Sequence, residues 1–139
     1  MIVSVSRDCD LPFSTDFLKR FRELVPPQDV EKYLSTFRVQ RRVSFRLNTL
    51  KVTPDELERE LQSLGIPFEH VAWLPEAYLA PPEKRELLVN CPVFFEGRLY
   101  VQDLSSMLAV HVLDPQPGEE ILDLAAAPGG KTCHMAARM

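Results

Sequence analysis

Cysteine is scarce in this chain, and its spacing excludes several classes of protein. The 139 residues contain three cysteines, Cys9, Cys91 and Cys133, which is an odd number without a C-x-x-C pair. This spacing argues against a disulfide framework and against a zinc site. The pattern predicts a cytoplasmic protein with reduced thiols and no bound metal.

The chain also lacks a net positive charge and a long hydrophobic run. Its formal net charge of −4 at pH 7 argues against a globally basic nucleic-acid binder, so any such contact must come from a local patch. The apolar residues before Arg7 are Ile2, Val3 and Val5, which fall far short of the core of a signal peptide. Since no run approaches the length of a membrane span, we predict no membrane partner.

Glycine is rare too, with five in the chain, yet two of them are adjacent. The apolar run 121–127 leads into Pro128, Gly129 and Gly130, which predicts a buried strand followed by a tight turn and a helix. Adjacent glycines let a ligand approach the backbone closely, and the free N–H groups of the next helix face that ligand. The candidate ligand-binding residues are Ala125, Ala126, Ala127, Pro128, Gly129, Gly130 and Lys131.

Three general interpretations of this turn compete. A phosphate-binding P-loop requires glycine five positions before Gly130-Lys131-Thr132, where this chain has Ala125. A dinucleotide fingerprint requires G-x-G-x-x-G, and the adjacent glycines do not give that spacing. A plain connection from strand to helix explains a proline and a glycine, but not the whole unbroken string.

The string at residues 122–132 resembles the S-adenosylmethionine-binding motif L-D-x-C-A-A-P-G-G-K-T of the Sun (Fmu) family of RNA cytosine-5 methyltransferases. Ala125 departs where many members carry a cysteine, which is not the nucleophile. Two further segments match the family in the right order. Residues 46–51 resemble its R-x-N-T-L-K motif, and residues 97–106 resemble its G-x-x-Y-x-Q-x-x-S-S segment.

The resemblance implies an α/β protein with two parts. Residues 1–97 would form an α+β RNA-recognition-like module, and residues 98–139 the start of a class I, Rossmann-like methyltransferase domain. Residues 125–131 would hold S-adenosyl-L-methionine, and the partner would be RNA, most similar to the ribosomal-RNA branch. We expect the chain to be an N-terminal fragment, because the first strand of the catalytic sheet comes near residue 121 and the rest of that sheet is missing.

No residue of this chain is assigned a catalytic role. The family adds a cysteine thiolate to the cytosine ring and uses a second cysteine for release, and both lie well downstream of the cofactor turn. Cys91-Pro92 reverses the order of the family's Pro-Cys motif, so Cys91 is interpreted as a small buried residue. Cys133 follows the turn directly and is assigned to the cofactor helix.

Basic residues gather between positions 32 and 54, where no acidic residue occurs. Alternation of apolar and polar residues over 42–48 predicts a half-buried strand with Arg42 and Arg46 on its solvent face. Arginine bonds phosphate through two donors at once, and Lys51 lies nearby. From charge alone, the arginines could equally lie on a solvated strand face or pair with acidic residues such as Glu56 and Glu58. The resemblance favours Arg42, Arg46 and Lys51 as RNA-binding residues.

Periodicity predicts further helices and strands. Helices are expected after Ser14, from residue 30, after Thr53 with a capping box to Glu56, and after Asp103. Strands are expected at residues 68–72 and 99–101. Prolines interrupt residues 73–98, where short strands at 87–89 and 93–95 are expected.

Two functions of different class follow from these observations. In the first, the chain is the front part of an RNA cytosine-5 methyltransferase and is inactive alone, because the catalytic cysteines lie beyond it. In the second, it is a stand-alone RNA-binding or regulatory remnant that no longer uses a cofactor.

Overall fold

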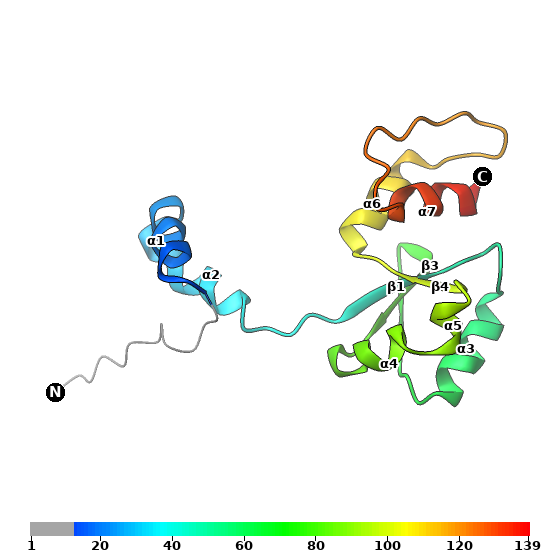
Figure 1. Ribbon diagram of the computed structural model, residues 1–139, viewed down its shortest axis with the longest axis horizontal. Helices are drawn as coiled ribbons and strands as arrows, with labels where there is room; N and C mark the ends of the chain where they lie inside the picture. Colours follow the sequence, from blue (N-terminus) through cyan, green and yellow to red (C-terminus); the bar gives the residue numbers. More distant parts are fainter. Residues whose placement is uncertain (1–12) are drawn as a thin grey trace. The chain divides into compact units, whose positions relative to one another are not determined.

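The computed structural model describes residues 13–139 (Figure 1), so the expectations for residues 2–5 and for Cys9 lie outside the described part. By its internal contacts the chain divides into two compact units, residues 1–40 and residues 41–139. The expected boundary at residue 97 differs from this division and stays a prediction about domains.

The first unit contains two helices joined by a proline-rich turn. Helix α1 (Thr15–Leu24) begins after Ser14, whose hydroxyl accepts a hydrogen bond from the Phe17 amide at 3.2 Å, as expected for a cap. The turn η2 (Pro27–Asp29) leads into α2 (Val30–Thr36). The rings of four phenylalanines pack on one another between the helices, namely Phe13, Phe17, Phe21 and Phe37.

The second unit is built on a four-stranded antiparallel sheet with the strand order β2-β3-β1-β4. Its strands are β1 (Val43–Leu47), β2 (Glu69–Val71), β3 (Leu74–Ala80) and β4 (Leu99–Val101). Since β1 and β2 both run antiparallel to β3, they are parallel to each other. With α3 (Pro54–Ser63) between them, they form the expected β-α-β unit, split by β3.

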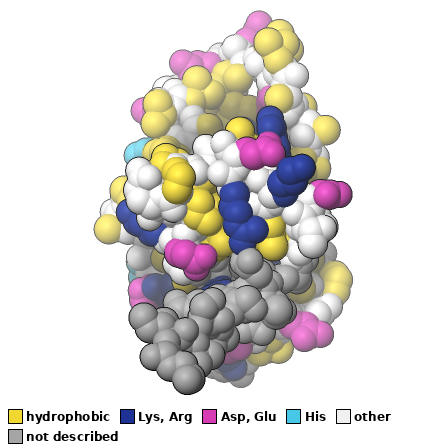
Figure 2. Space-filling model, turned by 90° about the vertical axis from the view of Figure 1, so that its left-hand side faces the viewer, with side chains coloured by type: hydrophobic (Ala, Val, Ile, Leu, Met, Phe, Trp, Pro, Cys, Tyr) yellow, Lys and Arg dark blue, Asp and Glu magenta, His cyan; other side chains and the backbone are white. Residues whose placement is uncertain are grey.

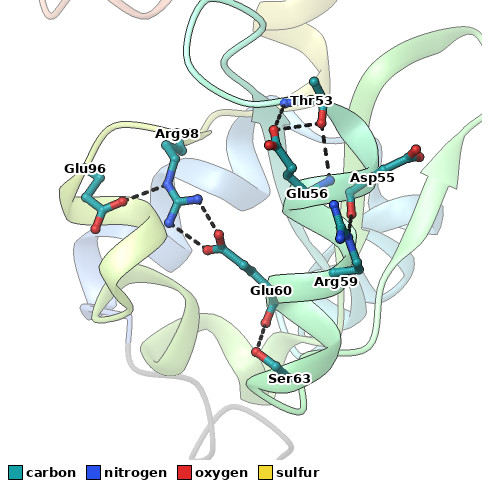
Figure 3. Close-up of polar contacts among 8 residues, drawn as sticks. All are labelled: Thr53, Asp55, Glu56, Arg59, Glu60, Ser63, Glu96 and Arg98. Atoms are coloured by element: carbon teal, nitrogen blue, oxygen red, sulfur yellow. Dashed lines mark hydrogen bonds and ion pairs between the residues drawn. The ribbon is translucent and has the colours of Figure 1, made fainter.

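Helix α3 begins with the predicted capping box. An ion pair between Glu60 of this helix and Arg98, the residue before β4, links the helix to the sheet. The Thr53 hydroxyl caps the Glu56 amide, while the Glu56 carboxylate accepts from the Thr53 amide at 2.9 Å. Figure 3 shows Arg98 reaching across to Glu60 with two nitrogens, and to Glu96. These bonds raise the pKa of Arg98, with the bond to Glu60 as the largest cause.

Both faces of the sheet are covered (Figure 1). On one face Phe45 of β1 and Tyr78 of β3 pack with α3, α4 (Arg85–Val89) and α5 (Pro92–Phe95) in the main core. The other face lies against α6 (Leu104–Leu113) and α7 (Gly130–Arg138), with Met107 packed on Leu74 and Ala77. All five residues of β1 are therefore buried, and the expectation of a half-exposed strand is wrong.

The proline-rich stretch differs most from expectation. Residues 87–89 and 93–95 form the short helices α4 and α5, not strands, because Pro82 and Pro92 each stand in the first turn of a helical segment. Strand β3 was not expected, since Pro75 interrupts its pattern. Prolines thus mark helix starts here, with η3 (Pro82–Lys84) before α4.

Residues 121–127 do not form the expected buried strand. Leu122 is 81% exposed and Leu124 is 89% exposed, and within residues 13–139 no strand pairs with this segment. The apolar pattern of a central strand is present, but a strand requires a neighbour to bond its backbone.

Candidate functional site: the glycine turn before helix α7

The turn before α7 forms one wall of a pocket of about 230 Å³. Six of the seven residues expected to bind the cofactor line this pocket, among them Gly130 and Lys131 at the start of α7. The wall opposite comes from the end of β4 and the first turn of α6. The lining residues are Ala125, Ala126, Ala127, Pro128, Gly130, Lys131, Tyr100, Val101, Gln102 and Ser106.

Gly129 is needed for its backbone conformation. It caps α7 with φ 103°, in the left-handed region that L-residues with a Cβ atom rarely adopt. The peptide bond between Ala127 and Pro128 is cis. Cys133 donates its amide to the Gly129 carbonyl at 2.8 Å, so it lies in the first turn of the helix, as expected.

Asp123 stabilises the turn through two hydrogen bonds of its side chain. Its carboxylate accepts the Thr132 hydroxyl at 2.7 Å and the Ala125 amide at 3.0 Å. These two hydrogen bonds hold the pKa of Asp123 below its usual range, with the bond from Thr132 as the largest cause. The string at 122–132 therefore closes on itself through side chains and leaves the alanines free to line the pocket.

Arg46 is buried, in contrast to the expected position on a solvent face. It is 2% exposed, because α6 and α7 cover the face of β1 from which it projects. Its Nε donates to Gln102 Oε1 at 3.0 Å, its Nη2 lies 3.5 Å from the Gly130 carbonyl, and its guanidinium lies over the Tyr100 ring at 5.1 Å. Burial lowers the pKa of Arg46.

The other two basic candidates remain exposed and paired. Arg42 donates to Glu69 at 2.7 Å, so the acid that it meets is neither Glu56 nor Glu58. This bond lowers the pKa of Glu69. Lys51 donates its ammonium to the Glu96 carbonyl at 2.8 Å. Their RNA-binding role stays a prediction.

Helix α7 is anchored to the sheet by residues that the sequence did not single out. Glu76 of β3 meets His134 Nε2 at 3.1 Å and Arg138 Nε at 3.7 Å, and His134 is 1% exposed. The hydrogen bond with His134 is the main cause that lowers the pKa of Glu76. Thr49 donates its hydroxyl to the Ala137 carbonyl at 2.8 Å, which holds the far end of the helix.

Other expectations about single residues have clear outcomes. Cys91 is buried and donates its thiol to the Leu88 carbonyl at 3.0 Å, as expected for a packed cysteine. His111 packs its ring edgewise on Trp73, as expected for a packed side chain. Asn48 bonds the Gly97 carbonyl and the Leu50 amide, which gives it a structural role. Asp103 precedes α6, but its side chain makes no capping bond.

Within residues 13–139, the His, Cys, Asp and Glu side chains form no group of three or more that could hold a metal ion. Over the same residues, none of the helices combines the length and the apolar character that crossing a membrane requires.

Two family descriptions cover most of the chain. Residues 13–104 match the N-terminal domain of 16S rRNA methyltransferase RsmF, and residues 110–139 match 16S rRNA methyltransferase RsmB/F. The first match ends after β4, which fits the pairing of β4 with β1 in one sheet.

Individual relatives agree with these matches. The chain is 34% identical over 120 residues to ribosomal RNA small subunit methyltransferase F of Shewanella oneidensis, covering 85% of this chain and 25% of that protein. It is 33% identical over 121 residues to the 26S rRNA (cytosine-C(5))-methyltransferase nsun-1 of Caenorhabditis elegans, covering 86% of this chain and 18% of that protein.

A solved methyltransferase homologue from Pyrococcus horikoshii superposes with a TM-score of 0.69 at 33% identity, covering 91% of this chain and 41% of that one. The chain spans about a quarter or less of the length of the Shewanella and Caenorhabditis relatives. On the two family matches, with the first covering residues 13–104, the chain belongs to the Sun (Fmu) family of RNA cytosine-5 methyltransferases.

Proposed function

We propose that this chain supplies the S-adenosylmethionine-binding turn and part of the RNA-binding surface of an enzyme that methylates carbon 5 of cytosine in ribosomal RNA. The observation that carries the proposal is the pocket at the turn, which is lined by Ala125, Ala126, Ala127 and Gln102, and by Lys131 at the helix start. When bound, the cofactor would supply an electrophilic methyl group. The cytoplasm as the compartment is part of this proposal.

The residues of the pocket suit one end of the cofactor. A volume of about 230 Å³ is below the range of roughly 300–1,000 Å³ typical of complete small-molecule sites. The small alanine side chains leave room for a ligand, while Lys131 and the first amides of α7 favour a negative group. We therefore assign the methionine end of the cofactor to residues 125–131.

RNA contacts are proposed for the exposed basic residues Arg42 and Lys51. On the face that Figure 2 displays, basic side chains are interspersed with acidic ones. A chain with a net charge of −4 would bind RNA through a few phosphates, with each neutralised phosphate adding about 0.7 to the slope of log K against log salt for a single strand.

Titration of the ¹⁵N-labelled chain with S-adenosylmethionine tests the cofactor assignment. We expect dissociation constants on the order of millimolar, because the ligand is held at one end, and amide shifts confined to residues 125–132. Lys131→Ala should weaken binding several-fold, whereas Lys84→Ala, on η3, should leave it unchanged. Absence of shifts at the turn would contradict the proposal.

The RNA assignment is tested by filter binding of a ribosomal RNA stem-loop at several salt concentrations. Arg42→Ala combined with Lys51→Ala should weaken binding and lower the salt slope by about 0.7 per lost contact. Arg20→Ala combined with Lys84→Ala removes the same charge elsewhere and serves as the control. Equal slopes for the two double variants would remove Arg42 and Lys51 from the RNA surface.

A further inference from the structure

Gln102 is held rigidly where β4 ends. Its amide donates to the Ser44 carbonyl at 3.2 Å, and its carbonyl accepts the Ser44 hydroxyl at 2.7 Å. Both bonds join it to β1 in the middle of the sheet. The backbone of Gln102 is therefore fixed on both sides before any ligand binds.

The side chain of Gln102 is fixed as well, and in one orientation. Arg46 Nε donates to Gln102 Oε1 at 3.0 Å, and a guanidinium group can only donate. A flipped amide would set two donors against each other, so the oxygen must face Arg46 and Nε2 must point away from Arg46 Nε. Arg46 is itself held by burial and by the Tyr100 ring.

This arrangement leaves one donor without a partner beside the pocket. Gln102 is 8% exposed, and its Nε2 is buried without a hydrogen-bond acceptor. The residue lines the same pocket as Ala125, Ala126 and Lys131. Because a buried donor without an acceptor is destabilising, a ligand oxygen that accepted a hydrogen bond from Nε2 would be bound favourably.

The chemistry of the neighbouring groups selects the kind of oxygen. Lys131 carries a positive charge on the pocket wall, and α7, nine residues long, presents its N-terminus there. Donors and positive charge together favour an anion. S-adenosylmethionine has a single anionic group, the carboxylate of its methionine part.

We propose that Gln102 binds the carboxylate of the cofactor through Nε2, and that Arg46 is the positioning residue that fixes the amide for this contact. The inference rests on the proposed function and extends the site from the turn to the sheet. It also gives Arg46 a role different from RNA binding.

The side-chain NH₂ signals of Gln102 provide a direct test in the ¹⁵N-labelled 139-residue chain. We expect these signals to shift on addition of S-adenosylmethionine and to stay in place with 5′-methylthioadenosine, which has no amino-acid part. Gln102→Glu keeps the bond from Arg46 but replaces the donor by a negative oxygen. It should weaken S-adenosylmethionine binding about tenfold or more, which corresponds to 1.4 kcal/mol or more.

Two further variants separate a binding role from a structural one. Gln62→Glu makes the same change on the exposed side of α3 and should bind like the wild type. Arg46→Lys keeps the charge but loses the Nε–H donor, so the Gln102 NH₂ signals should broaden or shift before ligand is added, with a smaller loss of affinity. Thermal unfolding of each variant verifies that it is folded.

The outcomes are distinct. Wild-type binding with unmoved Gln102 NH₂ signals, or with unchanged affinity in a folded Gln102→Glu variant, overturns this inference and leaves the proposed function standing. No wild-type binding at about 10 mM ligand, a free energy weaker than about −2.7 kcal/mol, overturns the proposed function together with it.

Discussion

Arg46 is a buried charge that donates a hydrogen bond to the side-chain oxygen of Gln102. Replacing it by Met would leave Gln102 Oε1 without its donor in the interior. We expect Arg46→Met to lower the free energy of unfolding by about 2–4 kcal/mol, measured by urea denaturation. Arg42→Met, at an exposed position, should stay within about 0.5 kcal/mol of the wild type. A stable Arg46→Met variant would show that the network is not structural.

Glu76 makes the attachment of α7 sensitive to acid. Folding lowers the pKa of this carboxyl, chiefly through the hydrogen bond with His134, with Arg138 contributing. The ionised Glu76 therefore stabilises the folded chain fully above the unfolded pKa of about 4.3. That stabilisation is lost as the pH falls through the lower, folded pKa.

Glu76→Gln should therefore flatten the dependence of the free energy of unfolding on pH below about pH 5. Urea denaturation at several pH values measures this slope in the variant and the wild type. The groups that face Glu76 are His134 and Arg138 and, at longer range, Arg46. An identical slope in the variant would show that the Glu76 carboxylate does not contribute.

For single residues, the sequence predicted some positions in the fold and missed others. The alternation over 42–48 correctly predicts which side of β1 packs on the main core, but it cannot distinguish a solvent face from a face covered by a second layer. Arg46 therefore looked exposed. Gln102 stood within a matched motif, yet its importance depends on Arg46, 56 residues away. Glu76 lies among prolines, where no pattern marks it.

Helix α3 owes part of its stability to its first turn. The capping box satisfies two backbone donors through Thr53 and Glu56. We expect Thr53→Ala to lower the free energy of unfolding by about 1 kcal/mol, whereas Thr53→Ser keeps the hydroxyl and should lose much less. Thermal unfolding of both variants measures the difference, and equal losses would mean that the methyl group of Thr53 matters more than its hydroxyl.

The helices with capping signals and three of the four strands were predicted, whereas strand β3 was not. The caps Ser14 and Thr53 predict the starts of α1 and α3, because their hydrogen bonds lie within one helical turn. Strand β3 pairs with β1 and β2 on either side, and Pro75 within it interrupts the local pattern that would have predicted it. Residues 121–127 show the opposite case, since their composition predicts a strand whose partners are absent from the described sheet.

At the scale of the whole molecule, the described core belongs to the second unit. The clusters around Phe45 and around Leu74 contain only residues after position 42. We expect a chain of residues 41–139 to keep the unfolding midpoint of the full chain within a few degrees, measured by circular dichroism. A large loss of stability would show that the first unit supports the sheet.

The second unit should also be unequal in its local stability. Amides of residues 122–124 lack strand partners and should exchange with solvent rapidly, whereas those of β1, in the middle of the sheet, should exchange slowly. Hydrogen exchange with and without S-adenosylmethionine measures both. Strong protection at residues 122–124 in a monomer would contradict this picture.

The backbone of Gly129 has a consequence for handedness. Its φ of 103° lies in a region that an L-residue enters only with strain, but that a D-residue adopts readily because its steric map is the mirror image. In a chain assembled by chemical ligation, D-alanine at position 129 should match or exceed glycine in stability, by up to about 1 kcal/mol through loss of unfolded-state freedom. L-alanine at the same position should cost about 1–3 kcal/mol. The turn should thus distinguish the two configurations of alanine at position 129.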